Sequence, residues 1–370
     1  MKRQIPHGFS LYLDTVRFLA AVVVLLHHTW PLLFPRFPVP WPGHSAVVVF
    51  FVLSGYVITH ASRPGLDFRV YAQHRMARIL PVTLAALALS YCISPVAGTN
   101  PLPFSGPMEF VGLNAVLNAL FLGQSWVDIA PPFNPPFWSL NYEVWYYIIF
   151  GTWVYAPSRL YAAIAAAVAG PHILLLMPVW LLGVALYKWM PVIDHARAKN
   201  IFIGSAIAGL AYIWFDVSVQ IREGMKTLWP VAMSLTHGSG MFVGDFLFGI
   251  IVTANFTAAA SLRMRILFPA QSMIKYLSSF TFSAYVFHMP LVIFLWNGVG
   301  VHEAIAFYPL LTLTIFAFGQ LTERQTKFYR SILQRWTPIR ARSETGLLQK
   351  EIDTPLSLTG LDPGRTSEKP

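Results

Sequence analysis

An arginine and a histidine lie eleven residues apart inside the first long apolar stretch of the chain, LDTVRFLAAVVVLLHHTW. Ionisable side chains within a membrane span are costly, at about 2.5–3.5 kcal/mol for a charged one. On an α-helix, eleven residues advance about 16 Å and return to within about 20° of the same face. Arg17 is therefore a cation near one end of a span, and His28 is a titratable base deep in the same span. Both lie on one face of the helix, and this costly arrangement indicates a function.

Asp14 belongs to the same stripe, because residues three and four apart share a helical face. One interpretation is structural. Asp14 and Arg17 would form a buried ion pair, and His28 would be a core histidine whose hydrogen bonds are satisfied within the protein. The neighbouring His27 and the two charges favour a chemical role instead. In that role His28 is a candidate general base.

Two further arginines, Arg75 and Arg78, lie three residues apart in HRMARILP, at the mouth of a later apolar run. They share a helical face, and the fork of a guanidinium matches the oxygens of a phosphate. The pair therefore suits a phosphate-bearing ligand. An ordinary positively charged anchor on the cytoplasmic side is an equal alternative.

Three other segments carry polar groups in apolar surroundings. Glu143 lies in the aromatic run FWSLNYEVWYY, which includes Tyr147, and a carboxylate just inside a span needs a partner. Tyr285 and His288 are three apart in SAYVFHMP, where a histidine bonded to a carbonyl freed by proline is at least as good an interpretation. The Ser-Gly of FFVLSGY is typical of close helix packing. Two more polar groups in apolar segments, Asp245 and His237, have no assigned role.

Composition identifies the class of protein. Of the 370 residues, 55% are hydrophobic and only 11% are charged, and the mean hydropathy is +0.55. A soluble protein of this size needs far more charge, so we expect an all-α, polytopic transmembrane bundle. The net charge of +10 fits a membrane protein with positive cytoplasmic loops better than a nucleic-acid partner. The single cysteine, Cys92, excludes internal disulfides and cysteine-based zinc sites.

Apolar runs and charge predict ten spans with both termini in the cytoplasm. This orientation puts nearly all of the 26 lysines and arginines on the cytoplasmic side, and leaves only Arg36, Arg222 and Lys226 outside. The predicted spans are 11–31, 45–62, 79–97, 138–157, 158–171, 172–189, 201–216, 231–257, 277–297 and 303–321.

The same orientation puts His28 and Glu143 at similar depth near the outer surface, which predicts a histidine–carboxylate pair for proton transfer. Residues 98–137 form a long outer segment without lysine or arginine, and its middle, 110–124, is expected on the membrane surface or re-entering it. Residues 1–340 are predicted to form the transmembrane domain, and 341–370 a polar, disordered cytoplasmic tail.

Searches for other chemistries are negative. The sequence has no Walker A loop, no dinucleotide-binding glycine pattern and no HExxH metal motif. It also lacks the GxSxG nucleophile elbow. The missing motifs argue against an ATP-driven transporter and against a zinc-dependent hydrolase. No metal site is predicted.

Taken together, these segments resemble the membrane-bound acyltransferase 3 family. The matching pieces, in chain order, are Leu13-Asp14-x-x-Arg17-Phe-x-Ala-Ala with the Arg-x10-His spacing to His28, FFVLSGYVIT (50–59), RxxRILP (75–81), WSLxxE (138–143) and Tyr-x-x-His-x-Pro (285–290). Each motif is weak alone, but five in the right order are specific.

The resemblance implies transfer of an acyl group, most often acetyl, from acyl-coenzyme A to a hydroxyl of a cell-envelope or exported carbohydrate or glycolipid. It implies essential roles for Arg17 and His28, donor binding by Arg75 and Arg78, and a role for the acidic Glu143. Asp14, Tyr147, Tyr285 and His288 are expected to support them. Acyl-coenzyme A is then a co-substrate rather than a permanent cofactor, and the protein resides in the inner (plasma) membrane.

Two alternatives to the enzyme remain at this level. A polytopic transporter or flippase for a lipid-linked sugar would also line its pathway with polar residues. A non-catalytic membrane scaffold in envelope synthesis is the third interpretation.

Overall fold

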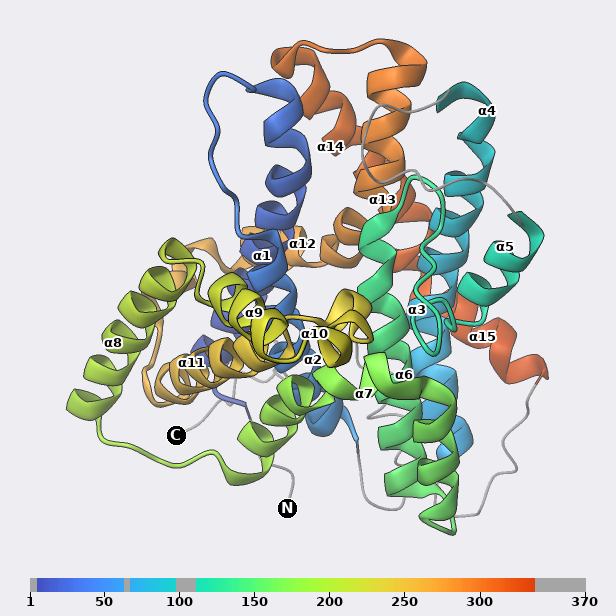
Figure 1. Ribbon diagram of the computed structural model, residues 1–370. Coiled ribbons are helices and arrows are strands. Elements are labelled where there is room, and N and C mark those ends of the chain that lie inside the picture. Colours follow the sequence, from blue (N-terminus) through green and yellow to red (C-terminus); the bar gives the residue numbers. More distant parts are fainter. Residues whose placement is uncertain (1–4, 63–66, 98–110, 337–370) are drawn as a thin grey trace, which may run out of the picture.

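The computed structural model describes residues 5–62, 67–97 and 111–336, and the regular structure in these ranges is helical throughout (Figure 1). The all-α prediction is therefore confirmed. The α-helices are α1 His7–Leu33, α2 Gly43–Ala61, α3 Phe68–Cys92, α4 Ser94–Ala97, α5 Val111–Ala119, α6 Trp138–Tyr155, α7 Leu160–Trp189, α8 His195–Trp214, α9 Val217–Leu228, α10 Pro230–Ser234, α11 Phe242–Ser261, α12 Gln271–Ser278, α13 Thr281–Ile293, α14 Ala304–Leu321 and α15 Thr326–Trp336. The short helices are η1 Pro135–Phe137, η2 His237–Ser239, η3 Arg265–Ala270, the π-helical η4 Phe294–Val299 and η5 Glu323–Gln325.

Within the described residues, seven helices are long and apolar enough to cross a membrane, or eight if the bent pair α8–α9 forms one span. This count is lower than the predicted ten. The spans predicted at 158–171 and 172–189 are the two halves of α7, which meet at a kink and count once among the seven. Helix α6, whose first turns are polar, is not among the seven. The ten-span count and the cytoplasmic termini stay predictions.

Helix α7 is interrupted at Gly170, which has a φ of 80° and a ψ of 172°. This backbone conformation favours glycine because it has no Cβ. A Cβ here would also lie 2.5 Å from the carbonyl oxygen of Ser125. The boundary predicted between the spans 158–171 and 172–189 lies at this interruption, where two helices meet at a kink.

Segment 110–124, expected on or in the membrane surface, contains only the nine-residue helix α5. Nine residues rise about 13 Å, which is too short for a bilayer core of about 30 Å. The rest of the described outer segment is loop up to η1, which leads directly into α6. The predicted tail, 341–370, lies outside the described residues.

The centre of the bundle is the contact of α2 with α1, α6, α7 and α11. Helices α8, α9 and α11 form a group on one side, and α13 and α14 pair at the far end of α1 (Figure 1). Helix α1 also contacts α13. The arrangement places the residues of α1 beside α2 on one flank and α13 on another.

Helices α2 and α7 approach each other through glycine. A Cβ on Gly183 would lie 1.9 Å from the carbonyl oxygen of Val52, and one on Gly55 would lie 2.1 Å from that of Trp180. Small residues at such seams let membrane helices pack backbone to backbone. The Ser-Gly of the FFVLSGY segment therefore does serve packing through its glycine.

We predict that Gly183→Ala destabilises the protein, because the added methyl group forces α2 and α7 apart, at a cost of about 1–3 kcal/mol. The measurement is the thermal unfolding midpoint of the purified protein in detergent, which should fall. Gly204→Ala is the matched control, since no atom lies within 4 Å of a Cβ at that helical position. Equal midpoints for the two variants would contradict the close approach.

Candidate active site

One end of the candidate site is a cluster of charged residues from α1 and α3, here called the arginine cluster: Asp14, Arg17, Arg75 and Arg78. These four residues line a cavity of about 30 Å³ together with residues of α2. Arg17 Nη2 donates to Asp14 Oδ1 at 2.7 Å. The Asp14–Arg17 ion pair considered from their spacing is thus present, and Arg17 lies together with Arg75 and Arg78, the two arginines predicted to bind the donor.

Arg75 is the unusual member of the arginine cluster. Its side chain is buried, and its Nε has no hydrogen-bond partner. Among the described residues, its guanidinium makes no ion pair, and its recorded contact is with the Tyr147 ring, 5.9 Å from the ring centroid. A buried unpaired charge is strongly unfavourable. The arginine cluster therefore carries positive charge that Asp14 alone does not balance.

The other end of the candidate site is a pair of histidines, His28 on α1 and His288 on α13. Nδ1 of His28 lies 3.2 Å from Nε2 of His288 and 2.9 Å from the carbonyl oxygen of Val24. The ring centroids of the two histidines are 5.0 Å apart. The fold thus joins two histidines that are 260 residues apart in the sequence.

The hydrogen bonds of the pair assign the protons of the neutral rings. Nδ1 of His288 lies 2.7 Å from the carbonyl oxygen of Tyr285 and 3.1 Å from that of Ala284, so it must carry a proton and donate. Its Nε2 is then an acceptor for His28 Nδ1–H. This leaves the lone pair of His28 on Nε2, which is the atom that could take a proton.

The local sequence of α13 explains how His288 is held. Pro290 has no amide hydrogen and frees the carbonyl of Val286, and Asn134 Nδ2 donates to that oxygen at 3.1 Å. Tyr285 hydrogen-bonds Ser139 Oγ at 2.7 Å. The freed carbonyl is thus satisfied by Asn134, and His288 is available to orient His28.

Glu143 does not pair with His28 within the described residues. Its Oε1 accepts from Ser54 Oγ at 2.7 Å and from the hydroxyl of Tyr147 at 2.5 Å. Trp180 Nε1 donates to the same Ser54 oxygen at 3.3 Å. The carboxylate therefore belongs to a network between α2, α6 and α7, and the expected histidine–carboxylate pair is not formed.

One face of α6 runs between the two ends of the candidate site. Ser139, Glu143 and Tyr147 recur every four residues and so lie on one stripe. Ser139 bonds Tyr285, one turn from His288, and Tyr147 lies beside Arg75. A continuous polar stripe thus connects the arginine cluster with the histidine pair.

Sequence reasoning missed several partners. Ser54 was assigned to packing, but it bonds Glu143 and Tyr147. Glu323 was not noticed, although its Oε2 accepts from the amide and hydroxyl of Ser283 at the start of α13. An acidic residue directly after the last apolar run was the only available signal.

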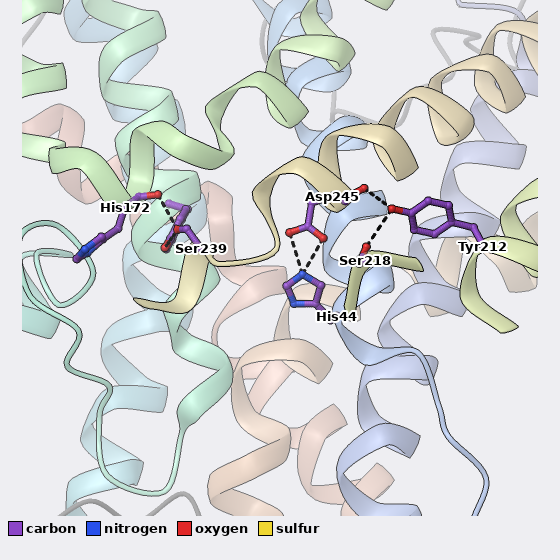
Figure 2. Close-up of polar contacts among 8 residues, drawn as sticks. His44, His172, Tyr212, Ser218, Ser239 and Asp245 are labelled. Atoms are coloured by element: carbon purple, nitrogen blue, oxygen red, sulfur yellow. Dashed lines mark hydrogen bonds and ion pairs between the residues drawn. The ribbon is translucent and has the colours of Figure 1, made fainter. Parts of the chain in front are cut away.

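Asp245, which had no assigned role, bonds a histidine that sequence reasoning did not select. Nε2 of His44 lies 2.9 Å from both carboxylate oxygens of Asp245 (Figure 2). Nothing in the spacing of two residues 201 positions apart could have indicated this pair. No group of three or more histidine, cysteine, aspartate or glutamate residues in the described ranges could hold a metal ion.

Comparison with known proteins identifies the family of the chain. A family model for an acyltransferase domain matches residues 10–324. Acyltransferase MdmB of Streptomyces mycarofaciens is 33% identical over 114 residues, which are 30% of this chain and 28% of that relative. No solved structure matches the chain. Since the family model spans most of the chain, from the helix of Arg17 and His28 to Glu323 and Arg324, the protein belongs to the acyltransferase 3 family of membrane acyltransferases.

Proposed function

We propose that the protein is an O-acyltransferase of the plasma membrane, which moves an acetyl group from acetyl-coenzyme A to a hydroxyl of a cell-envelope or exported carbohydrate. The observation that carries the donor assignment is the guanidinium of Arg75, which is buried beside Arg78 and Arg17 and makes no ion pair with a described residue. Coenzyme A supplies phosphates that suit such a site. The acetyl group and the carbohydrate rest on resemblance to the family.

The spacing of the two ends supports a donor that lies along α1. Arg17 and His28 are about 16 Å apart along the helix axis. An extended coenzyme A arm with its phosphates at Arg75 and Arg78 can bring its thioester toward His28. Because the cavity at the arginine cluster is only about 30 Å³, the arm would lie along the α6 stripe rather than inside that cavity.

The proposed reaction begins with His28. Its Nε2 takes the proton of the acceptor hydroxyl while that oxygen attacks the thioester carbonyl. The carbon–sulfur bond breaks, and the proton passes from the imidazolium to the leaving thiolate, giving free coenzyme A and the ester. An acyl-histidine intermediate on the same nitrogen is the alternative route. In both routes His288 holds the ring so that Nε2 faces the reaction.

The direct test is incubation of the purified protein with acetyl-coenzyme A labelled in the acetyl group, together with envelope glycans extracted from cells that lack the protein. We expect label in the glycans. Intact acetyl-coenzyme A and unlabelled glycans after long incubation would refute the proposal. Mass spectrometry of the labelled glycan identifies the acceptor.

His28→Ala should lower the rate of transfer by roughly 10²–10⁴-fold, the usual contribution of a general base. The rate is measured at saturating donor, with the thermal midpoint as the test of folding. His302→Ala is the control, because that exposed histidine bonds the carbonyl oxygen of Trp296 and belongs to neither end of the candidate site. Full activity in His28→Ala would remove the base from the mechanism.

Arg75→Met should raise the KM for acetyl-coenzyme A roughly 10–100-fold, which corresponds to the loss of one charged hydrogen bond. The thermal midpoint should stay the same or rise, since an unpaired buried charge disappears. Arg159→Met is the comparison, because its guanidinium lies over the Trp153 ring, 4.3 Å from the ring centroid. An unchanged KM, or a loss of stability without a change in KM, would contradict donor binding by Arg75.

His288→Leu should lower kcat about tenfold, because His28 Nδ1–H loses its acceptor and the ring its orientation. His288→Gln should recover part of the loss, since an amide oxygen can accept the same proton. The KM for acetyl-coenzyme A should not change in either variant. Equal kcat in the two variants would show that His288 acts only as a core residue.

A further inference from the structure

A second histidine–carboxylate pair lies outside the site described so far. His44, in the first turn of α2, and Asp245, in the first turn of α11, are joined by both carboxylate oxygens (Figure 2). The side chain of Asp245 is 2% exposed and that of His44 is 32% exposed. The carboxylate is thus enclosed, while the His44 side chain is partly exposed.

The carboxylate of Asp245 occupies one ring nitrogen of His44, so only the other nitrogen can bind a ligand. Nε2–H points at Asp245, as a carboxylate holds the ring of a catalytic histidine in one tautomer. Nδ1 therefore lies on the other side of the ring, and it has no hydrogen-bond partner among the described residues. A hydroxyl can both donate and accept, so it suits Nδ1 in either protonation state of the ring.

Asp245 is held firmly enough to act as such a support. The hydroxyl of Tyr212 donates to the carbonyl oxygen of Gly244 at 2.8 Å, and Ser218 Oγ bonds the same tyrosine at 3.2 Å (Figure 2). These bonds tie the start of α11 to α8 and α9. A buried ionisable residue in a membrane bundle that is anchored in this way is a candidate for function.

His44 also lies on the His28 side of the bundle. The preceding residue, Gly43, contacts the ring of His27, because a Cβ there would lie 2.6 Å from His27 Cγ. The rings of His27 and His28 are 4.9 Å apart. The start of α2, which carries His44, therefore lies at the His27–His28 end of α1, away from Asp14 and Arg17.

The indole ring of Trp138 lies next to His44 and offers a second surface that a ligand could contact. Trp138, at the start of α6, is nearly parallel to His44, with ring centroids 6.0 Å apart and an interplanar angle of 13°. Trp138 is partly exposed. An aromatic face beside a fixed hydrogen-bonding nitrogen suits a ring that carries hydroxyl groups, with an apolar face and polar edges.

We propose that His44, positioned by Asp245, binds the acceptor carbohydrate, and that its Nδ1 hydrogen-bonds a hydroxyl that is not itself acylated. Trp138 packs against the sugar ring. This inference rests on the proposed function and adds an acceptor subsite to it. His44 acts in binding, whereas the proton of the reacting hydroxyl goes to His28.

Two variants separate binding from a purely structural role. In His44→Gln the side-chain amide reaches the position of Nε2 and can still satisfy Asp245, but nothing replaces Nδ1. In His44→Asn the amide replaces Nδ1, and the contact with Asp245 is lost. His195→Gln, in the exposed first turn of α8, is the control.

The experiment uses the purified full-length protein, labelled acetyl-coenzyme A and glycans extracted from cells that lack the protein. We expect His44→Gln to raise the half-saturating glycan concentration about tenfold, which is the size of one lost hydrogen bond. Its KM for acetyl-coenzyme A and its thermal midpoint should equal those of the unmodified protein. His44→Asn should be less impaired in glycan binding and less stable to heat.

Wild-type glycan saturation in His44→Gln would overturn the inference, because it would mean that His44 only neutralises Asp245. A raised KM for acetyl-coenzyme A with unchanged glycan saturation would overturn it as well. If the unmodified protein transfers no label, the proposed function itself fails. The first two outcomes leave that function intact, so the two failures are distinguishable.

Discussion

A charge inside an apolar bundle must find a partner, and the candidate site is organised by this requirement. Asp14 pairs with Arg17, Asp245 with His44, and Glu143 accepts hydrogen bonds from Ser54 and Tyr147. The Asp14–Arg17 pair acts within one turn of α1. The contacts of Asp245 and Glu143 join separate helices and fix their relative positions. Arg75 is the exception, since its buried guanidinium makes no ion pair at contact distance with a described residue. The positive charge of Arg75 is therefore uncompensated at contact distance, and it lies at the end where the donor phosphates are proposed to bind.

The two ends of the site differ in chemistry and are joined by rigid helices. The arginine cluster offers fixed positive charge, and the histidine pair offers a lone pair whose position is set by His288. Helix α1 carries a residue of each end about 16 Å apart, and the α6 stripe runs between them. Because these distances lie within helices rather than loops, the arginine cluster and the histidine pair keep their separation. His44 and Asp245 form a further fixed pair at the start of α2 and α11, where the acceptor is proposed to bind.

Local features of the site were predictable from the sequence, and long-range ones were not. The Asp14–Arg17 pair follows from a three-residue spacing on one helix, and the membrane bundle follows from composition. Depth in the membrane alone wrongly grouped Glu143 with His28, because depth does not say which way a side chain points around its helix axis. The contact of His28 with His288 and that of His44 with Asp245 join helices distant in sequence. The boundary predicted between the spans 158–171 and 172–189 coincides with the kink at Gly170, where glycine and proline adjoin.

The most direct test of the account is a structure of the protein in complex with a non-hydrolysable acetyl-coenzyme A analogue, determined by electron cryo-microscopy. The account predicts phosphate density against Arg75 and Arg78, a pantetheine arm along Glu143 and Tyr147, and the carbonyl of the acyl group beside Nε2 of His28. An analogue bound with its acyl end away from His28, or with its phosphates away from both arginines, would contradict the central claim that these two ends hold one extended donor.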